Sequence, residues 1–367
     1  MCLDDSCWEN VFSESELQEI INEGSRSFPS VSKNIQDILD RFQQAADLIC
    51  ENNKYETYDQ KLNGLMLNAM VDELLEIGLF DIRIHFDSKD DVFDSEDEES
   101  WVISTINQPL SYYVNELIAV MGNNISELDL VTKFWCYFDR CFDDLRINTT
   151  RDRACMATAL RVNEGRKVTG TDEIDNKKKS IRPDLLLVKD DVEYGCSEVG
   201  KSDNVIPTKK EIIETDLHCP KTMKDILNRV ASLVDYDEEI IKKLRFVCFH
   251  QTNRRMKLSL IDCPRGYICR VMESDEYDIP AQARLFPAQV HSLIKLMLQA
   301  KVIIKQLTGP GIVSETMQSL TRYQMSKKGE VGLRRQSQKE KKASTIVLPS
   351  SLNFTSNNLK RKRKIQD

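Results

Sequence analysis

Apolar residues recur at helical spacing in several stretches of this chain. Spacings of three and four residues place apolar side chains on one face of a helix. They predict a short helix over residues 15–21 and amphipathic helices that begin near Ile35, Leu62, Leu110, Ser126, Pro220 and Pro287. Ser126 is a suitable N-cap, and Pro220 suits a first helical turn, where a missing amide hydrogen costs little.

Shorter apolar runs that alternate with polar residues, or stop at turn residues, are typical of β-strands. Residues 82–86 alternate in this way. Residues 185–188 and 192–199 form two such runs, and Asp190 and Asp191 between them are turn residues. The pattern therefore predicts a β-hairpin over residues 185–199.

Three later apolar runs are separated by turn-compatible segments and predict an antiparallel meander over residues 244–250, 256–261 and 267–272. The apolar residues that we expect to be buried in it are Phe249, Leu258, Leu260 and Ile268. Helices and strands together predict an α/β (α+β) fold.

The chain of 367 residues divides by pattern into four regions. They are a loose acidic leader (1–30), a mainly helical region (31–133), an α/β core (134–309) and a disordered basic tail (310–367). Within the second region, residues 87–100 carry eight acidic side chains against one lysine, which predicts an exposed loop because the charges repel one another. These acids lack the ligand spacing of a calcium loop, so a solvated linker is favoured over a cation site.

The formal net charge of −8 conceals two oppositely charged parts. Residues 320–367 contain thirteen Lys and Arg against three acidic residues, so the rest of the chain carries −18. An acidic body is not typical of a protein that coats duplex DNA, whose affinity depends on a basic folded surface.

Five consecutive cations near the C-terminal end predict a nuclear localisation signal that binds an import receptor: Lys360, Arg361, Lys362, Arg363 and Lys364. Their mutual repulsion favours an extended, solvated segment that an acidic groove can bind. A phosphate-binding arm and a solubilising tail are the alternatives.

Eleven cysteines occur without a Cys-x-x-Cys pair and without an apolar signal segment after Met1, which favours reduced thiols in an intracellular protein. No apolar run approaches the roughly 18 residues of a membrane span, so no membrane partner is expected. His218-Cys219, and Cys263 with Cys269, raise the possibility of zinc, but paired-ligand spacing is missing.

The predicted hairpin also carries the candidate chemistry. Asp184 opens its first strand and Glu198 closes its second, so two carboxylates could meet at one end of the sheet and hold Mg²⁺ or Mn²⁺. Lys201 follows closely enough to contact a phosphate. The alternative is that Asp184 is an ordinary turn residue after proline and that Glu198 and Lys201 are surface charges.

Taken in order, the hairpin, the next helix and the later strands resemble the PD-(D/E)XK nuclease-like superfamily. In that superfamily an acid from Pro-Asp and an acid-x-Lys unit meet a magnesium ion. Asp184 matches the first element, and Glu198-Val-Gly-Lys201 matches the second with one extra residue. The stretch from about Phe134 to Leu307 also looks like a group of uncharacterised fungal proteins of expanded, mobile-element-like families. The segments shared with that group are Glu198-Val-Gly-Lys201, Cys-Pro-Lys-Thr-Met-Lys and Asp262-Cys-Pro-Arg-Gly-Tyr267.

The resemblance implies a restriction-endonuclease-like core sheet with flanking helices, and metal-dependent cleavage of DNA or RNA. The alternatives are a non-catalytic binding module that keeps the fold, and an interaction protein in which the hairpin is only core. Two features depart from the superfamily. On a regular strand Lys201 would face away from Glu198 unless Gly200 forms a bulge. Residues 163–180 also supply no clear strand before the Pro-Asp strand.

Overall fold

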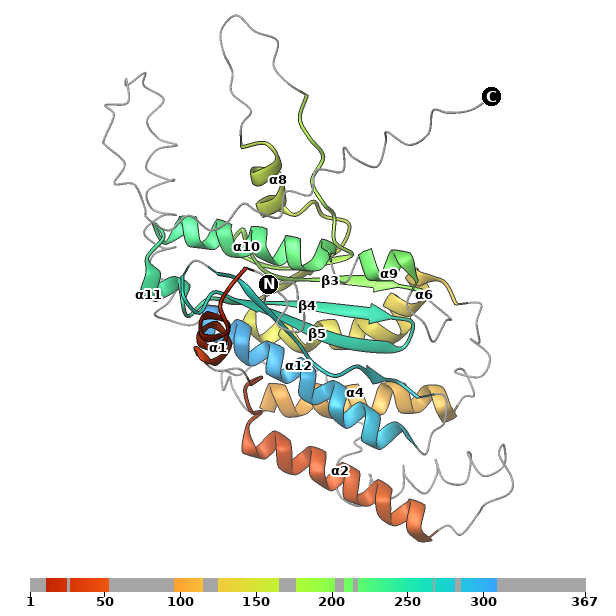
Figure 1. The fold of residues 1–367 in the computed structure, drawn as a ribbon. Coiled ribbons are helices and arrows are strands. Elements are labelled where there is room, and N and C mark those ends of the chain that lie inside the picture. The colour runs from red at the N-terminus through yellow and green to blue at the C-terminus, as the bar shows by residue number, and fades with distance from the viewer. Residues whose placement is uncertain are drawn as a thin grey trace, which may run out of the picture.

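A mixed β-sheet forms the centre of the computed structural model (Figure 1), which describes residues 11–24, 27–52, 96–114, 125–164, 176–201, 208–213, 217–266, 268–280 and 285–308. Within these residues the strands run in the order β1-β2-β3-β4-β5-β6, and β7 pairs with β5. Their bounds are β1 Asn148–Thr150, β2 Leu185–Lys189, β3 Val192–Gly200, β4 Arg245–Thr252, β5 Arg255–Asp262, β6 Arg270–Glu273 and β7 Tyr277–Asp278.

The predicted hairpin and meander are both confirmed. β2 pairs antiparallel with β3, and Asp190 and Asp191 between them have φ values of 50° and 61°. Positive φ at both turn positions fits the right-handed twist of a two-residue hairpin. β4, β5 and β6 pair antiparallel in sequence order. The four residues expected in the meander core, Phe249, Leu258, Leu260 and Ile268, are all buried.

One strand pair differs from the antiparallel pattern. β3 and β4 run parallel, and the helix α10 (Cys219–Leu233) lies in the connection between them. Gly195 lies at this junction, where a β-carbon would come within 2.7 Å of the Val247 carbonyl oxygen. Only glycine therefore allows β3 to lie this close to β4.

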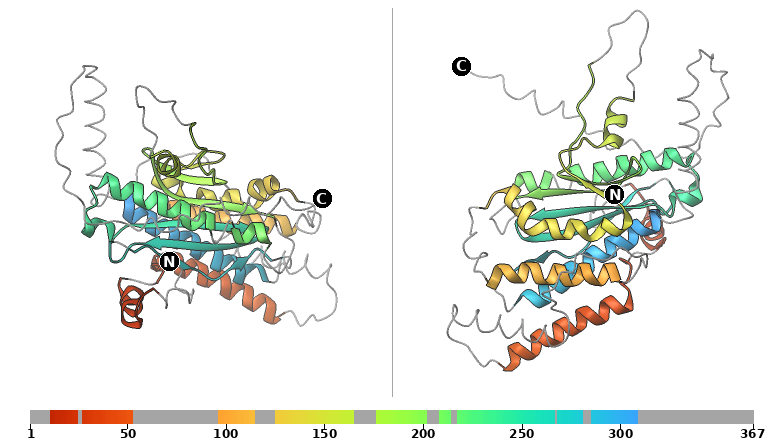
Figure 2. Two further views of the ribbon diagram at one scale, coloured as in Figure 1. Left: turned by 45° about the horizontal axis from the view of Figure 1, so that its top comes forward. Right: turned by 180° about the vertical axis from the view of Figure 1, so that it is seen from behind.

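Helices cover both faces of the sheet (Figures 1 and 2). On one face α10 packs against β3 and β4, and α8 (Met156–Val162) packs on α10. On the other face α12 (Phe286–Thr308) packs against β4, with α2 (Lys33–Asn52) and α4 (Glu96–Val114) beyond it. The rings of Phe42 on α2 and Phe286 on α12 meet edge to face at 6.3 Å. The predicted α/β class is thus confirmed as a mostly antiparallel mixed sheet with flanking helices.

The helix predicted from Ser126 is present as four consecutive helical pieces: α6 Glu127–Leu130, η3 Val131–Trp135, α7 Cys136–Asp139 and η4 Arg140–Leu145. The Ser126 hydroxyl accepts a bond from the Asp129 amide at 3.0 Å, which confirms the predicted cap. The structure also contains the short helices α9 (Lys209–Ile213) and α11 (Glu238–Ile241).

The helix expected from Leu110 begins much earlier than predicted. α4 starts at Glu96, so residues 96–100 of the predicted acidic loop are helical. Val102 and Ile106 are buried one helical turn apart, and acidic side chains are favourable at a helix N-terminus. Residues 87–95 of that loop, the helix near Leu62, the strand at 82–86 and the basic tail lie outside the described residues.

Part of the leader expected to be loose is attached to the body of the protein. Its predicted helix is α1 (Glu14–Asn22), and the buried guanidinium of Arg270 contacts the end of that helix. Arg270 Nη1 donates to the carbonyl oxygens of Ile20, Ile21 and Glu23 at 2.9–3.1 Å. Among the helices that the structure describes, none has the length and apolar character that a bilayer crossing needs.

Candidate functional site

Asp184 is held against the end of the hairpin by a backbone bond. It precedes β2 directly, and its Oδ2 accepts a hydrogen bond from the Val199 amide at 2.7 Å. The residue is nevertheless exposed, so its carboxylate remains open to solvent. A carboxylate fixed in this way is ready to bind a further ligand without losing side-chain freedom.

The strand register places Asp184 next to Glu198. Leu185 on β2 lies opposite Ser197 on β3, so one further step along the same register brings Asp184 opposite Glu198. Glu198 is half-buried near the end of β3. Two of the three predicted site residues therefore lie at the same end of the hairpin.

Lys201, the third predicted site residue, is the first residue after β3 and is exposed. The bulge considered at Gly200 is not found, because Glu198, Val199 and Gly200 pair in regular register with β4. Among the described glycines, positive φ occurs at Gly24 and Gly266 and not at Gly200. With Gly200 as the last residue of β3, Lys201 lies just beyond the strand and not on it.

A strand does precede the Pro-Asp strand, although the sequence did not reveal it. β1 lies upstream of the stretch in which such a strand was expected, and it pairs antiparallel with β2. It contains only Asn-Thr-Thr, with an exposed residue followed by two half-buried ones. Three polar residues produce no alternation, so this strand was not predictable from its pattern.

A pocket of about 280 Å³ opens beside Asp184. Two guanidinium groups line it, those of Arg151 and Arg182. Arg182 pairs with Asp152 at 3.2 Å, and Arg151 pairs with Asp139, which is not one of the lining residues. The remaining lining residues are Glu127, Leu128, Val131, Asp152, Pro183, Asp184 and Val199. The pocket combines acidic oxygens with cations that could contact a phosphate.

A second group of ligand-type side chains lies on the face that α10 covers. Cys219, Cys248 and His250 are buried, and one ligand atom of each lies within 4.8 Å of the others. Cys196 Sγ lies 3.4 Å from Cys248 Sγ. Burial lowers the pKa of His250 to about 4 and raises the pKa of the Cys248 thiol. Thiol and imidazole ligands suit zinc rather than magnesium.

The sequence suggested zinc near Cys219 but did not identify this group. Its members come from α10 and β4, so no short spacing motif joins them. The alternation of Cys248 and His250 on one predicted strand was the available signal, since side chains two residues apart share a face.

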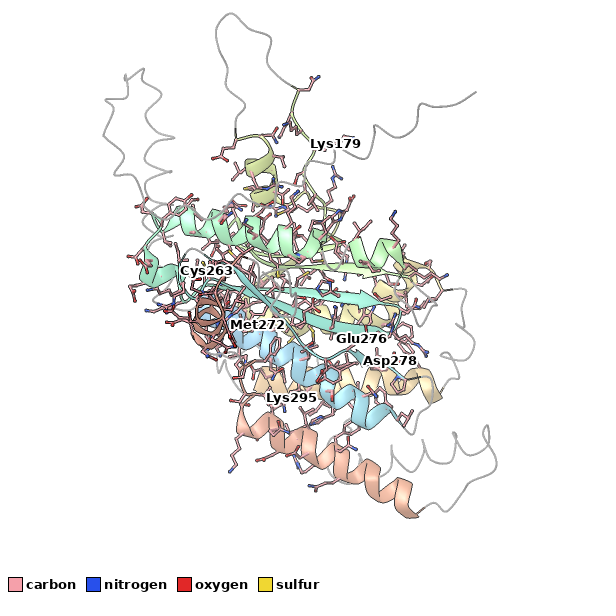
Figure 3. All side chains as sticks on the ribbon, in the orientation of Figure 1. Lys179, Cys263, Met272, Glu276, Asp278 and Lys295 are labelled. Atoms are coloured by element: carbon pink, nitrogen blue, oxygen red, sulfur yellow. The ribbon has the colours of Figure 1, made fainter. Side chains whose placement is uncertain are left out.

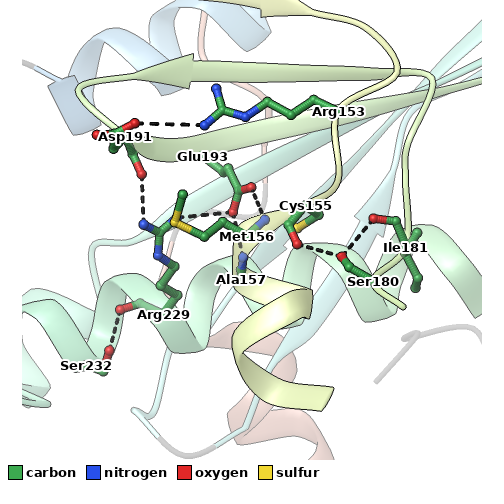
Figure 4. A network of polar contacts seen from close by, with 10 residues as sticks. All are labelled: Arg153, Cys155, Met156, Ala157, Ser180, Ile181, Asp191, Glu193, Arg229 and Ser232. Atoms are coloured by element: carbon green, nitrogen blue, oxygen red, sulfur yellow. Dashed lines mark hydrogen bonds and ion pairs between the residues drawn. The ribbon is translucent and has the colours of Figure 1, made fainter. Parts of the chain in front are cut away.

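A buried acidic network holds α8 against the sheet (Figure 4). The Glu193 carboxylate accepts bonds from the Met156 and Ala157 amides at 2.5 and 2.9 Å. Arg229 Nη1 lies 3.3 Å from the same carboxylate, and its Nη2 donates to the Asp191 carbonyl oxygen at 2.8 Å. Glu193 thus caps a helix, and its oxygens are already occupied by donors.

The stretch before the hairpin is rich in cations, and the structure describes only part of it. Arg161 pairs with the buried Asp225 at 2.5 Å, so this cation stabilises the α8–α10 contact. Lys177, Lys178 and Lys179 are exposed, and Lys179 lies on the side of α10 away from the sheet (Figure 3). Residues 165–175 lie outside the described residues.

Comparison of this chain with protein-family models, curated proteins and solved structures finds no match in any of the three.

Proposed function

We propose that the end of the β2–β3 hairpin binds a divalent metal ion and cleaves phosphodiester bonds in DNA or RNA. Asp184 and Glu198 are the proposed ligands. The observation that carries the proposal is the hydrogen bond from the Val199 amide to Asp184. It fixes the Asp184 carboxylate beside Val199, the residue that follows Glu198 on β3. Carboxylate oxygens are the ligands that Mg²⁺ and Mn²⁺ prefer, so the residues fit such an ion.

The order of elements supports this proposal. β1 precedes Pro183-Asp184, β2 and β3 follow, and α10 and then α11 lead to β4. Apart from α8 between β1 and β2 and the short helices α9 and α11, this order resembles that of the PD-(D/E)XK nuclease-like superfamily. We therefore propose that the sheet is a restriction-endonuclease-like core. The body from Phe134 onward also keeps the segments shared with the mobile-element-like fungal families.

Each residue has a proposed role. A bound magnesium ion would supply an activated water and polarise the scissile phosphate. Asp184 and Glu198 would hold that ion, Lys201 would stabilise developing negative charge, and Arg182 would orient the phosphate from the pocket wall. These assignments require the flexible lysine side chain to reach back from the end of β3.

The test is cleavage of DNA and RNA by the full chain with Mg²⁺, with Mn²⁺ and with a chelator. Asp184→Asn keeps an oxygen to accept the Val199 amide but removes the charge, and Glu198→Gln does the same on β3. Removing a residue that only hydrogen-bonds to a metal ligand typically lowers metal affinity or activity 10-fold to 100-fold. Asp184 and Glu198 are proposed as direct ligands, so each variant should lose at least about 100-fold in cleavage rate. Their melting temperatures should stay close to that of the wild type.

Glu127→Gln is the matched control, because Glu127 is an acidic residue that lines the same pocket and has no proposed role in cleavage. Its cleavage rate should remain near the wild-type value. Equal rates for the wild type, Asp184→Asn and Glu198→Gln would contradict the proposed site.

A non-catalytic binding module is the second candidate function. The position of Lys201 favours it, because this lysine is exposed beyond the strand that carries Glu198. In this case the wild-type chain would bind nucleic acid without cleaving it under any metal condition. The net charge of −18 outside residues 320–367 would make that binding depend on the cations of this segment, and therefore on salt.

A further inference from the structure

We propose that Cys219, Cys248 and His250 bind a structural Zn²⁺ ion, with Cys196 as the fourth ligand. The proposal does not depend on the proposed magnesium site, but the two sites are neighbours, because His250 lies opposite Glu198 in the β3–β4 register. The zinc ion would fix α10 to the two parallel strands that the helix crosses.

The topology brings the four side chains to one face of the sheet. Cys248 and His250 are two residues apart on β4 and so share a face. Cys196 on β3 pairs directly with Cys248 in the parallel register. Cys219 is the first residue of α10, which packs on β3 and β4. Residues from three elements therefore surround one point in the core.

The distances suit a tetrahedral zinc ion. Zinc bonds of about 2.3 Å to sulfur and about 2.0 Å to nitrogen place neighbouring ligand atoms roughly 3.5–3.8 Å apart. The ligand atoms of Cys219, Cys248 and His250 lie within 4.8 Å of one another, and the two sulfurs of Cys196 and Cys248 are 3.4 Å apart. Small side-chain rotations would bring the first three to bonding distance, and a rotation of Cys196 away from its contact with Cys248 would supply the fourth ligand. Three cysteines and one histidine form a common closed zinc site.

His250 offers an independent sign of a missing ligand. It is 5% exposed, and its Nδ1 has no hydrogen-bond partner among the described residues. Its Nε2 lies 2.7 Å from Ser259 Oγ, and that hydroxyl donates to Glu273 Oε1 at 3.2 Å. The hydroxyl thus accepts the Nε2 hydrogen, which leaves the lone pair on Nδ1.

This arrangement is the one that histidine ligands to metals usually have. Their second ring nitrogen donates to a hydroxyl, carbonyl or carboxylate that orients the ring. An unpaired nitrogen in a buried site costs free energy, and a bond to zinc would remove that cost. The four ligands are all buried, so no position remains open for water or substrate. The site is therefore structural rather than catalytic.

Metal content of the purified full chain tests the proposal. Elemental mass spectrometry should find about one zinc per wild-type chain, as expected for one closed site. Cys248→Ser and His250→Ala should each lower this ratio at least about 10-fold. Cys141→Ser is the matched control, since Cys141 is an equally buried thiol on η4, outside this cluster, and should retain the metal.

A second measurement uses only the wild type, so it holds even if the variants fold poorly. The protein is stripped with a chelator and reloaded with Co²⁺. Tetrahedral coordination by thiolates should give intense visible bands and a sulfur-to-cobalt charge-transfer band, and zinc should displace both. A wild-type chain that retains no zinc and develops no such bands would overturn the proposal. So would a disulfide between Cys196 and Cys248 in the native protein.

Discussion

The carboxylates of Glu193, which is buried, and of Asp139, which is half-buried, differ in how well their charge is matched. The Glu193 carboxylate has two backbone amides and the guanidinium of Arg229 around it. Asp139 on α7 is paired with Arg151, yet its pKa rises to about 6 because burial outweighs the attraction of that guanidinium. A single ion pair thus does not replace the hydration that Asp139 loses on folding.

The raised pKa of Asp139 predicts a pH-dependent loss of stability. An unfolded aspartate has a pKa near 3.8, so between about pH 4 and pH 6 the folded chain retains a proton that the unfolded chain has lost. The free energy of unfolding should therefore fall as the pH rises through this range, by up to about 3 kcal/mol at about 1.4 kcal/mol per pKa unit. Above about pH 6 the titration of Asp139 should change the free energy of unfolding no further.

Urea unfolding at several pH values measures this effect, with Asp139→Asn as the comparison. The variant cannot ionise, so the wild type should lose stability relative to it as the pH rises from about 4 to about 6. Parallel pH profiles for the two proteins would show that Asp139 titrates normally.

At the scale of elements, one buried arginine attaches α1 to the sheet. Arg270 Nε and Nη2 donate to the two carboxylate oxygens of Asp262 at 3.0 and 2.5 Å, and Nη1 donates to three carbonyl oxygens at the end of α1. The carbonyls at a helix C-terminus lack partners within the helix. One side chain therefore joins β5, β6 and a helix that is nearly the whole chain away in sequence.

Arg270→Met should destabilise the protein by about 3–5 kcal/mol, because it leaves Asp262 charged, buried and unpaired. α1 should at the same time become sensitive to proteolysis. Chemical unfolding and limited proteolysis measure the two effects. The double variant Arg270→Met with Asp262→Leu should recover part of the lost stability, since it removes the isolated charge.

Arg265→Met is the control for this prediction. Arg265 also pairs with α1, through Glu19 and Glu23, but at the surface. Its loss should cost no more than about 1 kcal/mol. A similarly small cost for Arg270→Met would mean that burial of that guanidinium contributes little to holding α1.

Long periodic elements were predictable from the sequence, and short or composite features were not. In α10, α12 and residues 35–42 of α2 the pattern of apolar positions matches the burial, and the apolar runs of the hairpin are buried in β2 and β3. β1 has only three polar residues, and α4 begins in an acidic run that resembles a linker. The proximity of Asp184 and Glu198 followed from hairpin pairing. The Cys219, Cys248 and His250 group depends on a parallel crossover that no local pattern encodes.

At the scale of the whole molecule, charge separates the folded body from the C-terminal stretch. Residues 320–367 carry ten net positive charges and the rest of the chain carries eighteen net negative charges. Residues after Thr308 lie outside the described residues, so the disordered tail and its function remain predictions. A solvated basic tail would be attracted to the acidic body at low salt and released as salt rises, because exposed charges are screened beyond roughly 10 Å at 0.1 M.

The five consecutive cations at 360–364 are predicted to direct nuclear import of any protein to which they are attached. Residues 320–367 would be fused to a fluorescent carrier too large to diffuse through nuclear pores, with Lys360, Arg361, Lys362, Arg363 and Lys364 intact or changed to alanine. The intact fusion should accumulate in the nucleus, because five adjacent cations suit the acidic groove of an import receptor. The alanine version should stay in the cytoplasm.

A third fusion, with Lys339, Lys341 and Lys342 changed to alanine, controls for loss of positive charge in general. It removes three cations from the same tail but leaves the C-terminal cluster whole, so it should still enter the nucleus. Cytoplasmic signal from the intact fusion would exclude an import signal in this segment. Nuclear signal from all three versions would show that the last cluster is not the determinant, and the cations would then be better explained as a phosphate-binding arm.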